Sequence, residues 1–139
     1  MSSAALAAIM DIVTPSSDGW QWPDFLEAVV AAPEHHAVLF ENDQVRVLGA
    51  RVEVGDTVPV HTHRWPSVQY VVSFADFVRR DGDGEVLVDS RAMDIPSERP
   101  IVLWSEPVPP HTLENVGDGL IHVIVVELKN LPARRQASS

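Results

Sequence analysis

The feature that most constrains the fold is a series of short apolar runs with a period of two residues. Alternation sends successive side chains to opposite faces of a strand, so such runs predict strands with one buried face. They recur roughly every eight to twelve residues between turn residues, and only residues 24–30 show a short helical period. The pattern predicts an all-β sandwich or barrel. The predicted strands are 38–40, 44–48, 51–54, 68–72, 75–78, 85–88, 101–104, 111–114 and 120–128.

The length and composition fit a single domain. The chain has 139 residues, 45% of them hydrophobic, which is enough to bury a sizeable core. We expect an N-terminal extension with a short helix at 1–36, the β domain at 37–129 and a polar tail at 130–139. The first ten residues lack a positive region and are too short for a membrane span, so they predict a packed or frayed helix.

The charge and the missing cysteines exclude several classes of function. A formal charge of -10 without a basic cluster opposes binding to phosphate backbones, so we expect neither nucleic acid nor a membrane as a partner. The absence of cysteine removes disulfides and thiolate ligands. A cytoplasmic location is the simplest interpretation, and histidine and carboxylate side chains must carry any metal chemistry.

Three histidines stand at positions that suggest a metal site. His61 and His63 are two residues apart on a predicted strand, so both side chains project from one face. His111 follows 48 residues after His63 and could close a three-nitrogen site. Three neutral imidazoles form a complete protein ligand set for a catalytic type of metal centre with open positions.

Two motifs around these histidines resemble those of the cupins. Gly55 is followed by five residues and then by His61-Thr62-His63, and His111 is followed by three residues and then by Asn115. The chain resembles a small single-domain cupin over roughly residues 36 to 129. The resemblance implies a double-stranded β-helix, or jelly-roll barrel, that holds a divalent transition metal, binds a small molecule and forms a homodimer.

The sequence departs from the family pattern in two places. The usual glutamate ligand, three or four residues after the second histidine, is replaced by Ser67 or Val68. Gln69 on the same strand could supply an oxygen ligand instead, or it could line the pocket and orient water. The usual Pro-x-Gly turn before His111 is replaced by residues 106–110, where two prolines should hold the chain extended.

The ligand set restricts the metal and leaves the reaction open. Imidazole ligands suit Fe, Zn or Ni better than Mg or Ca. The predicted function is that of a metalloenzyme, a three-histidine dioxygenase or a Lewis-acid lyase, acting on a small oxygenated molecule. The alternative is a non-catalytic cupin that binds or senses a small molecule. No general base can be assigned, so the catalytic residues stay unknown. Trp65, Ser67, Tyr70 and Trp104 are the candidates for lining the substrate pocket.

The remaining polar features are expected to have structural roles. His35 and His36 precede the first predicted strand, so a surface or interface position is expected for both. His122 lies in the most apolar strand and is expected to be structural. Residues 81–84 have the composition of a tight hairpin turn, and Asn115 should stabilise a turn through its side chain.

Overall fold

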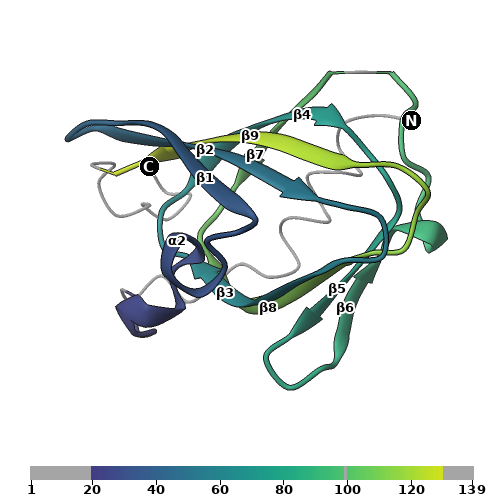
Figure 1. The fold of residues 1–139 in the computed structure, drawn as a ribbon, viewed down its shortest axis with the longest axis horizontal. Coiled ribbons are helices and arrows are strands. Elements are labelled where there is room, and N and C mark those ends of the chain that lie inside the picture. Colours follow the sequence, from purple (N-terminus) through teal and green to yellow (C-terminus); the bar gives the residue numbers. More distant parts are fainter. Residues whose placement is uncertain (1–19, 99, 130–139) are drawn as a thin grey trace, which may run out of the picture.

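The computed structural model describes residues 20–98 and 100–129, which form two facing antiparallel sheets with a short helical segment against one side (Figure 1). This confirms the all-β expectation. The helix expected at the start of the chain and the tail 130–139 lie outside the described residues. No helix within the described ranges is long and apolar enough to cross a membrane.

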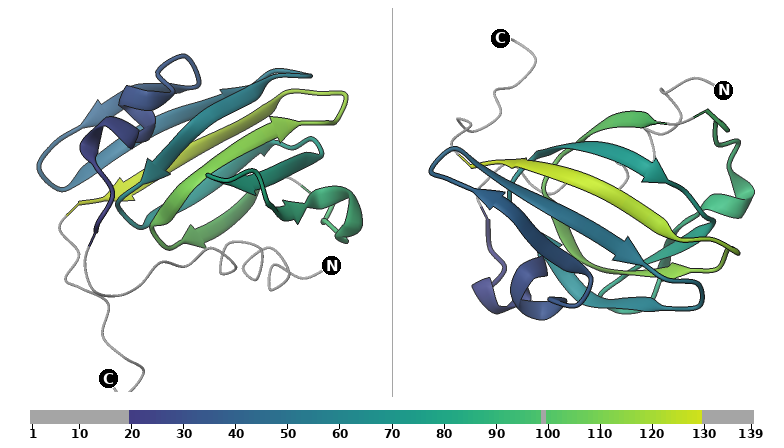
Figure 2. Two further views of the ribbon diagram at one scale, coloured as in Figure 1. Left: turned by 90° about the horizontal axis from the view of Figure 1, so that it is seen from below. Right: turned by 45° about the horizontal axis from the view of Figure 1, so that its top comes forward.

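The two sheets differ in size. The larger has five strands in the order β1 (His36–Glu41), β2 (Val45–Val52), β9 (Ile121–Leu128), β4 (Ser67–Ser73) and β7 (Ile101–Ser105). The smaller has four, in the order β3 (Thr57–His63), β8 (Val108–Asn115), β5 (Phe77–Asp81) and β6 (Val86–Asp89). Figure 2 shows how the sheets enclose a common interior, which each strand meets with alternate side chains.

Apolar side chains fill one part of this interior. One buried cluster contains Val71, Val88 and Ile101. A second contains Ala32, Val52, Val58, Ala75 and Ile121. Polar side chains occupy the rest of the interior, where His36, His61, His111, Arg46, Arg79 and Glu127 are all buried. Because buried charged and imidazole groups are unusual without partners, this polar region is where a functional site is expected.

The structure differs from the expected elements in two places. The runs at 44–48 and 51–54 were expected to be separate strands, but a single strand, β2, runs from Val45 through Gly49 to Val52. Gly49 lies within the strand under Leu39, whose Cδ1 would be 3.3 Å from an added Cβ. The expected single helix is divided into a 3-10 turn, η1 (Asp24–Leu26), and a short helix, α2 (Ala28–Ala31). Glu27 between them has an extended backbone, with ψ of 142°.

Several turns have the expected structure. The hairpin at 81–84 joins β5 to β6, with Gly84 at a φ of 91° that favours glycine. The side chain of Asn115 donates to the carbonyls of Val52 and Gly119 and accepts from the backbone N–H of Gly117. Asn115 is 1% exposed, and these bonds confirm its turn-stabilising role.

Candidate metal centre

The pairing of β3 with β8 brings the predicted histidines together. His61 lies directly opposite His111 in the register, and the two ring centroids are 4.2 Å apart. The centroid of His63 lies 5.0 Å from that of His61 and 5.7 Å from that of His111. Directly opposed residues of an antiparallel pair project from the same face, so this register explains the convergence. Figure 1 shows the two strands side by side.

The prolines before His111 are part of β8. The strand runs from Val108 through both prolines, so the chain is extended there, as expected. Proline has no N–H to donate to the ladder, and the register with β3 shifts between His61 and His63. The irregular pairing places His63 opposite Val108, two residues along β3 from the His61–His111 pair.

A fourth imidazole joins the cluster from the other sheet. His36, the first residue of β1, is 7% exposed, and its ring centroid lies 4.9 Å from that of His61 and 5.3 Å from that of His63. One nitrogen from each of His36, His61 and His63 lies within 4.8 Å of the others, a spacing that could hold a metal ion. The surface position expected for His36 is therefore wrong, because β1 begins at that residue and directs its side chain into the sandwich.

Hydrogen bonds fix which ring nitrogen each histidine can offer. The Nδ1–H groups of His36, His61 and His111 donate to the carbonyls of Ala32, Pro59 and Pro109, at 3.0, 2.7 and 2.8 Å. A carbonyl only accepts, so the proton must reside on Nδ1 and the lone pair on Nε2. This arrangement of a donated N–H and a free second nitrogen is typical of metal-ligating histidines.

His63 has a carboxylate partner instead of a carbonyl. Its Nδ1 lies 3.5 Å from Oε2 of Glu127, a fully buried residue of β9. Oε1 of Glu127 accepts from Nε of Arg46 at 2.6 Å, since Arg46 and Glu127 are directly opposed in the β2–β9 ladder. Nη2 of Arg46 also donates to Glu27 at 3.0 Å. The chain of contacts therefore runs from the histidine cluster through Glu127 and Arg46 to Glu27.

Burial keeps three of the four imidazoles neutral. Burial lowers the pKa of His36 to about 4 and lowers the pKa values of His61 and His111 well below their usual range. The pKa of Glu127 is lowered because, against the cost of burial, hydrogen bonds from His63 and Arg46 favour the carboxylate. Neutral imidazoles beside an ionised carboxylate form a site that is prepared to bind a cation.

Of the other predicted site residues, some lie in the interior, one packs on Arg46 and two face outward. Ser67 is buried, opposite Glu127 in the ladder, and accepts at Oγ from the amide of Gln69 at 3.4 Å. Trp65 packs against Arg46, whose Cζ lies 4.7 Å from the ring centroid. Tyr70 and Trp104, 44% and 43% exposed, face the outer side of their sheet, so the structure does not bring them to the histidines.

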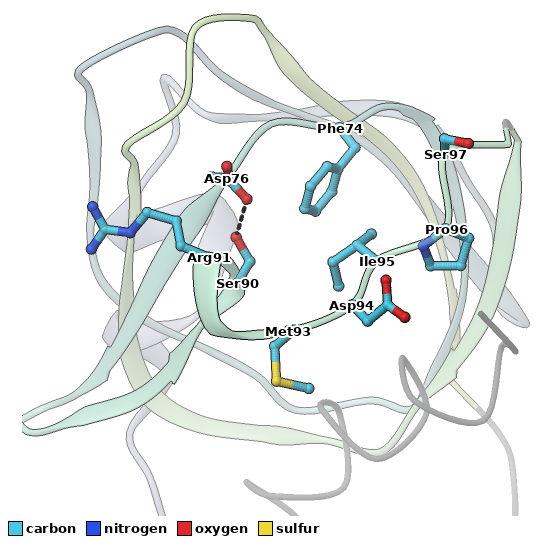
Figure 3. A pocket seen from close by; sticks show the side chains of 9 residues that line it. All are labelled: Phe74, Asp76, Ser90, Arg91, Met93, Asp94, Ile95, Pro96 and Ser97. Carbon is cyan, nitrogen blue, oxygen red and sulfur yellow. Dashed lines mark hydrogen bonds between the residues drawn. The ribbon is translucent and has the colours of Figure 1, made fainter.

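A hollow of about 390 Å³ lies elsewhere, beside the segment that follows β6 (Figure 3). Its lining includes Phe74, Asp76, Ser90, Arg91 and Ile95 and contains none of the clustered histidines. Ser90 donates to Asp76 at 2.9 Å and accepts from the backbone N–H of Phe77, so these polar groups already have structural partners. We therefore place the candidate site at the histidines.

Known proteins were compared by sequence and by structure. No family model and no curated protein matches this sequence. A cupin domain from Bordetella pertussis Tohama I matches with a TM-score of 0.55 and 18% identity, over 68% of this chain and 91% of that chain. An RmlC-like cupin with a double-stranded β-helix fold, from Methanocaldococcus jannaschii, matches with a TM-score of 0.48 and 11% identity, over 67% and 77%.

A third match is the polyketide cyclase RemF from Streptomyces resistomycificus, with a TM-score of 0.46 and 17% identity, over 75% of this chain and 71% of that chain. Identities this low establish the fold and transfer no activity. The fold suggested by the two histidine motifs is confirmed. This chain has the double-stranded β-helix fold of the cupin domain that it matches.

Proposed function

We propose that this protein binds a divalent transition metal through Nε2 atoms of His61, His63 and His111, with His36 as a fourth ligand. The observation that carries the proposal is the hydrogen bonding of the cluster: all four Nδ1 atoms face an acceptor, which leaves all four Nε2 atoms for another partner. Three buried rings and the partly buried ring of His63, all with unused lone pairs, fit a cation better than they fit each other.

The donor set favours iron, zinc or nickel. Imidazole nitrogen suits these ions, whereas magnesium and calcium prefer oxygen. The carboxylate that the family motif usually supplies is missing from the position of Ser67 or Val68, and His36 offers a nitrogen in compensation. Gln69 remains a predicted additional ligand; its Nε2 is directed to Ser67, so the amide oxygen is the atom it could offer.

The proposed role is that of a metalloenzyme acting on a small oxygenated organic molecule. When bound, the metal supplies Lewis acidity, and as iron it would also supply the capacity to react with dioxygen. The protein residues keep His36, His61 and His111 neutral and orient all four rings through their Nδ1 atoms. Trp65, packed on Arg46, is the aromatic residue that we propose for the rim of the substrate pocket.

A non-catalytic role in binding or sensing a small molecule is the second candidate. One observation favours it: the carboxylate at the cluster is already engaged, because Glu127 accepts from both His63 and Arg46. A carboxylate held in this way orients a histidine and is a poor general base. Oxygen uptake by the iron-loaded protein with a panel of diketones, thiols and catechols distinguishes the enzyme from the binding protein.

The metal proposal is tested by elemental analysis of protein purified without a histidine tag. We expect about one transition-metal ion per chain, and a double substitution His61→Ala and His111→Ala should remove it. His122→Ala, outside the cluster, is the matched control and should retain the metal. Adding metal at about 100 times its Kd should stabilise the metal-free protein by about 2.7 kcal/mol. Equal metal content in the double variant and the control would reject the proposal.

We propose that a second copy of this chain covers the exposed edge strand β1. Val38, Leu39 and Phe40 are 49%, 56% and 55% exposed, and β1 is the outer strand of its sheet, so both its apolar side chains and its backbone edge lack cover within the described chain. A homodimer through β1 would bury both.

The dimer should dissociate when charge is introduced on β1. We expect the unmodified protein to be a dimer by light scattering at micromolar concentration and Phe40→Asp to be a monomer, because dimerisation would bury a carboxylate without a partner. Phe25→Asp, at a residue that is 68% exposed outside β1, should leave the dimer intact. A monomeric unmodified protein would contradict the proposal.

A further inference from the structure

Arg79 is a buried cation for which the proposed metal site does not account. It lies on β5, opposite Leu113 of β8, and is 7% exposed. Its Nε and Nη1 atoms are buried and have no hydrogen-bond partner among the described residues. The next residue, Arg80, faces the other side of the strand and pairs at the half-exposed surface with Glu114 at 2.9 Å. The two arginines therefore have opposite surroundings.

Arg79 lies on the same side of its sheet as the histidine cluster. Its ladder partner Leu113 is two residues from His111, and side chains two apart on a strand share a face. The positive charge of Arg79 contributes, after burial, to the lowered pKa of His111, which shows that the two groups are close enough to interact. Arg79 therefore extends the polar interior from the histidines along β5.

No carboxylate within the described residues compensates the charge of Arg79. Burial lowers its pKa to about 10, without a carboxylate to oppose that effect, so the guanidinium is still a cation at neutral pH. Asp81, two residues further on, directs Oδ1 into the hairpin, where it accepts from the backbone N–H groups of Asp83 and Glu85. A buried guanidinium with unsatisfied donors is costly, and natural sites seldom retain one without an external acceptor.

The balance of charge in the interior indicates the sign of that acceptor. The buried charged groups include two cations, Arg46 and Arg79, and two carboxylates. Both carboxylates, Glu27 and Glu127, pair with Arg46. Burial keeps His36, His61 and His111 neutral by lowering their pKa values. A divalent metal would therefore leave the buried site with a net positive charge, which an anionic ligand would neutralise.

We propose that Arg79 is the recognition group for a small carboxylic acid, whose carboxylate accepts hydrogen bonds from the buried guanidinium while the rest of the molecule reaches the histidine cluster. This inference rests on the proposed metal function and narrows its substrate to organic carboxylates. Arginine suits the role because its planar donors match a carboxylate and its charge persists at all working pH values. Arg79 thus discriminates carboxylic acids from neutral molecules of the same shape.

The test is calorimetric titration of zinc-loaded protein with acetate and pyruvate, and with acetamide and pyruvamide as neutral counterparts of the same shape. We expect the acids to bind and the amides to bind at least about tenfold more weakly. Arg79→Met should weaken acid binding at least about tenfold, whereas Arg80→Met, its outward-facing neighbour, should change the Kd less than about twofold. Equal binding of acids and amides, or an unchanged Kd in Arg79→Met, would overturn the inference.

A second measurement keeps the test decisive if Arg79→Met does not fold. In the unmodified protein, the ¹⁵N-labelled side-chain Nε–H resonance of Arg79 should shift on titration with acetate and not with acetamide. If the chemical shift of this resonance does not change with acetate, water is the hydrogen-bond acceptor of the guanidinium and the inference fails. Metal content is measured in parallel: metal without Arg79-dependent acid binding rejects this inference alone, whereas acid binding through Arg79 without metal rejects the metal function alone.

Discussion

Replacing Arg46 with methionine should destabilise the fold by about 3–5 kcal/mol, because it leaves two buried carboxylates without their cation. Glu27 and Glu127 are 6% and 0% exposed, and Arg46 donates to both. Burial already raises the pKa of Glu27 despite the contact with Arg46. Without the guanidinium, folding must bury one or two charges or force the carboxylates to take up protons. Chemical denaturation at pH 7.5 measures the loss.

The matched control is Arg91→Met, which removes a guanidinium from a surface ion pair with Asp89, where Arg91 is 56% exposed. Such exposed pairs contribute little to stability, because water and salt screen them. The pH dependence provides a second check. In Arg46→Met the folded carboxylates should have raised pKa values, so the penalty is full above those values and disappears as the pH falls below the unfolded pKa of about 4.3. A loss no larger than that of Arg91→Met would contradict the assignment.

The fold could be predicted from the sequence because its signals are local. Alternating apolar residues define the strands, and the turn at 81–84 and the bonds of Asn115 follow from the chemistry of single residues. The division of β2 into two expected strands was wrong for a reason that is not local: Gly49 lies inside the strand, where Leu39 of the neighbouring strand packs over it. That contact belongs to the pairing of two strands, so one strand read alone cannot reveal it.

The sequence predicted only those site residues that spacing within one strand and the two family motifs indicate. His61, His63 and His111 come together because β3 pairs with β8, as the motifs imply. His36 comes from the opposite sheet, and Glu127 and Arg46 are neighbours only in the β2–β9 ladder. In hindsight, Arg46 and Glu127 give a signal, because they are charged residues inside mostly apolar strands and the parity of each strand places them on its buried face. Arg79 gives none, since Arg80 and Asp81 follow it in the same short strand.

Removing His36 should weaken metal binding more than replacing Glu127, the carboxylate that orients His63. Glu127→Gln leaves every imidazole in place but changes the group that orients His63 and pairs with Arg46, so it should raise the Kd by about 10–100-fold. If His36 is a fourth ligand, His36→Ala should exceed that range and should also change the visible spectrum of the cobalt-substituted protein, because the number of nitrogen ligands falls. His122→Ala is the control for the loss of an imidazole outside the cluster.

The effect of His36→Ala can also be measured without metal, as the change in the stability of the fold at acid pH. In the metal-free protein, the folded pKa of His36 is about 4, below the usual value of 6.5, so the unfolded chain binds more protons between these values and the fold loses stability as the pH falls through that window. His36→Ala removes this part of the loss. A variant that is less sensitive to acid yet binds zinc and cobalt as the unmodified protein does would show that His36 is a buried histidine and no ligand. The three histidines of β3 and β8 would then form the whole nitrogen set, and the open positions of the metal would increase by one.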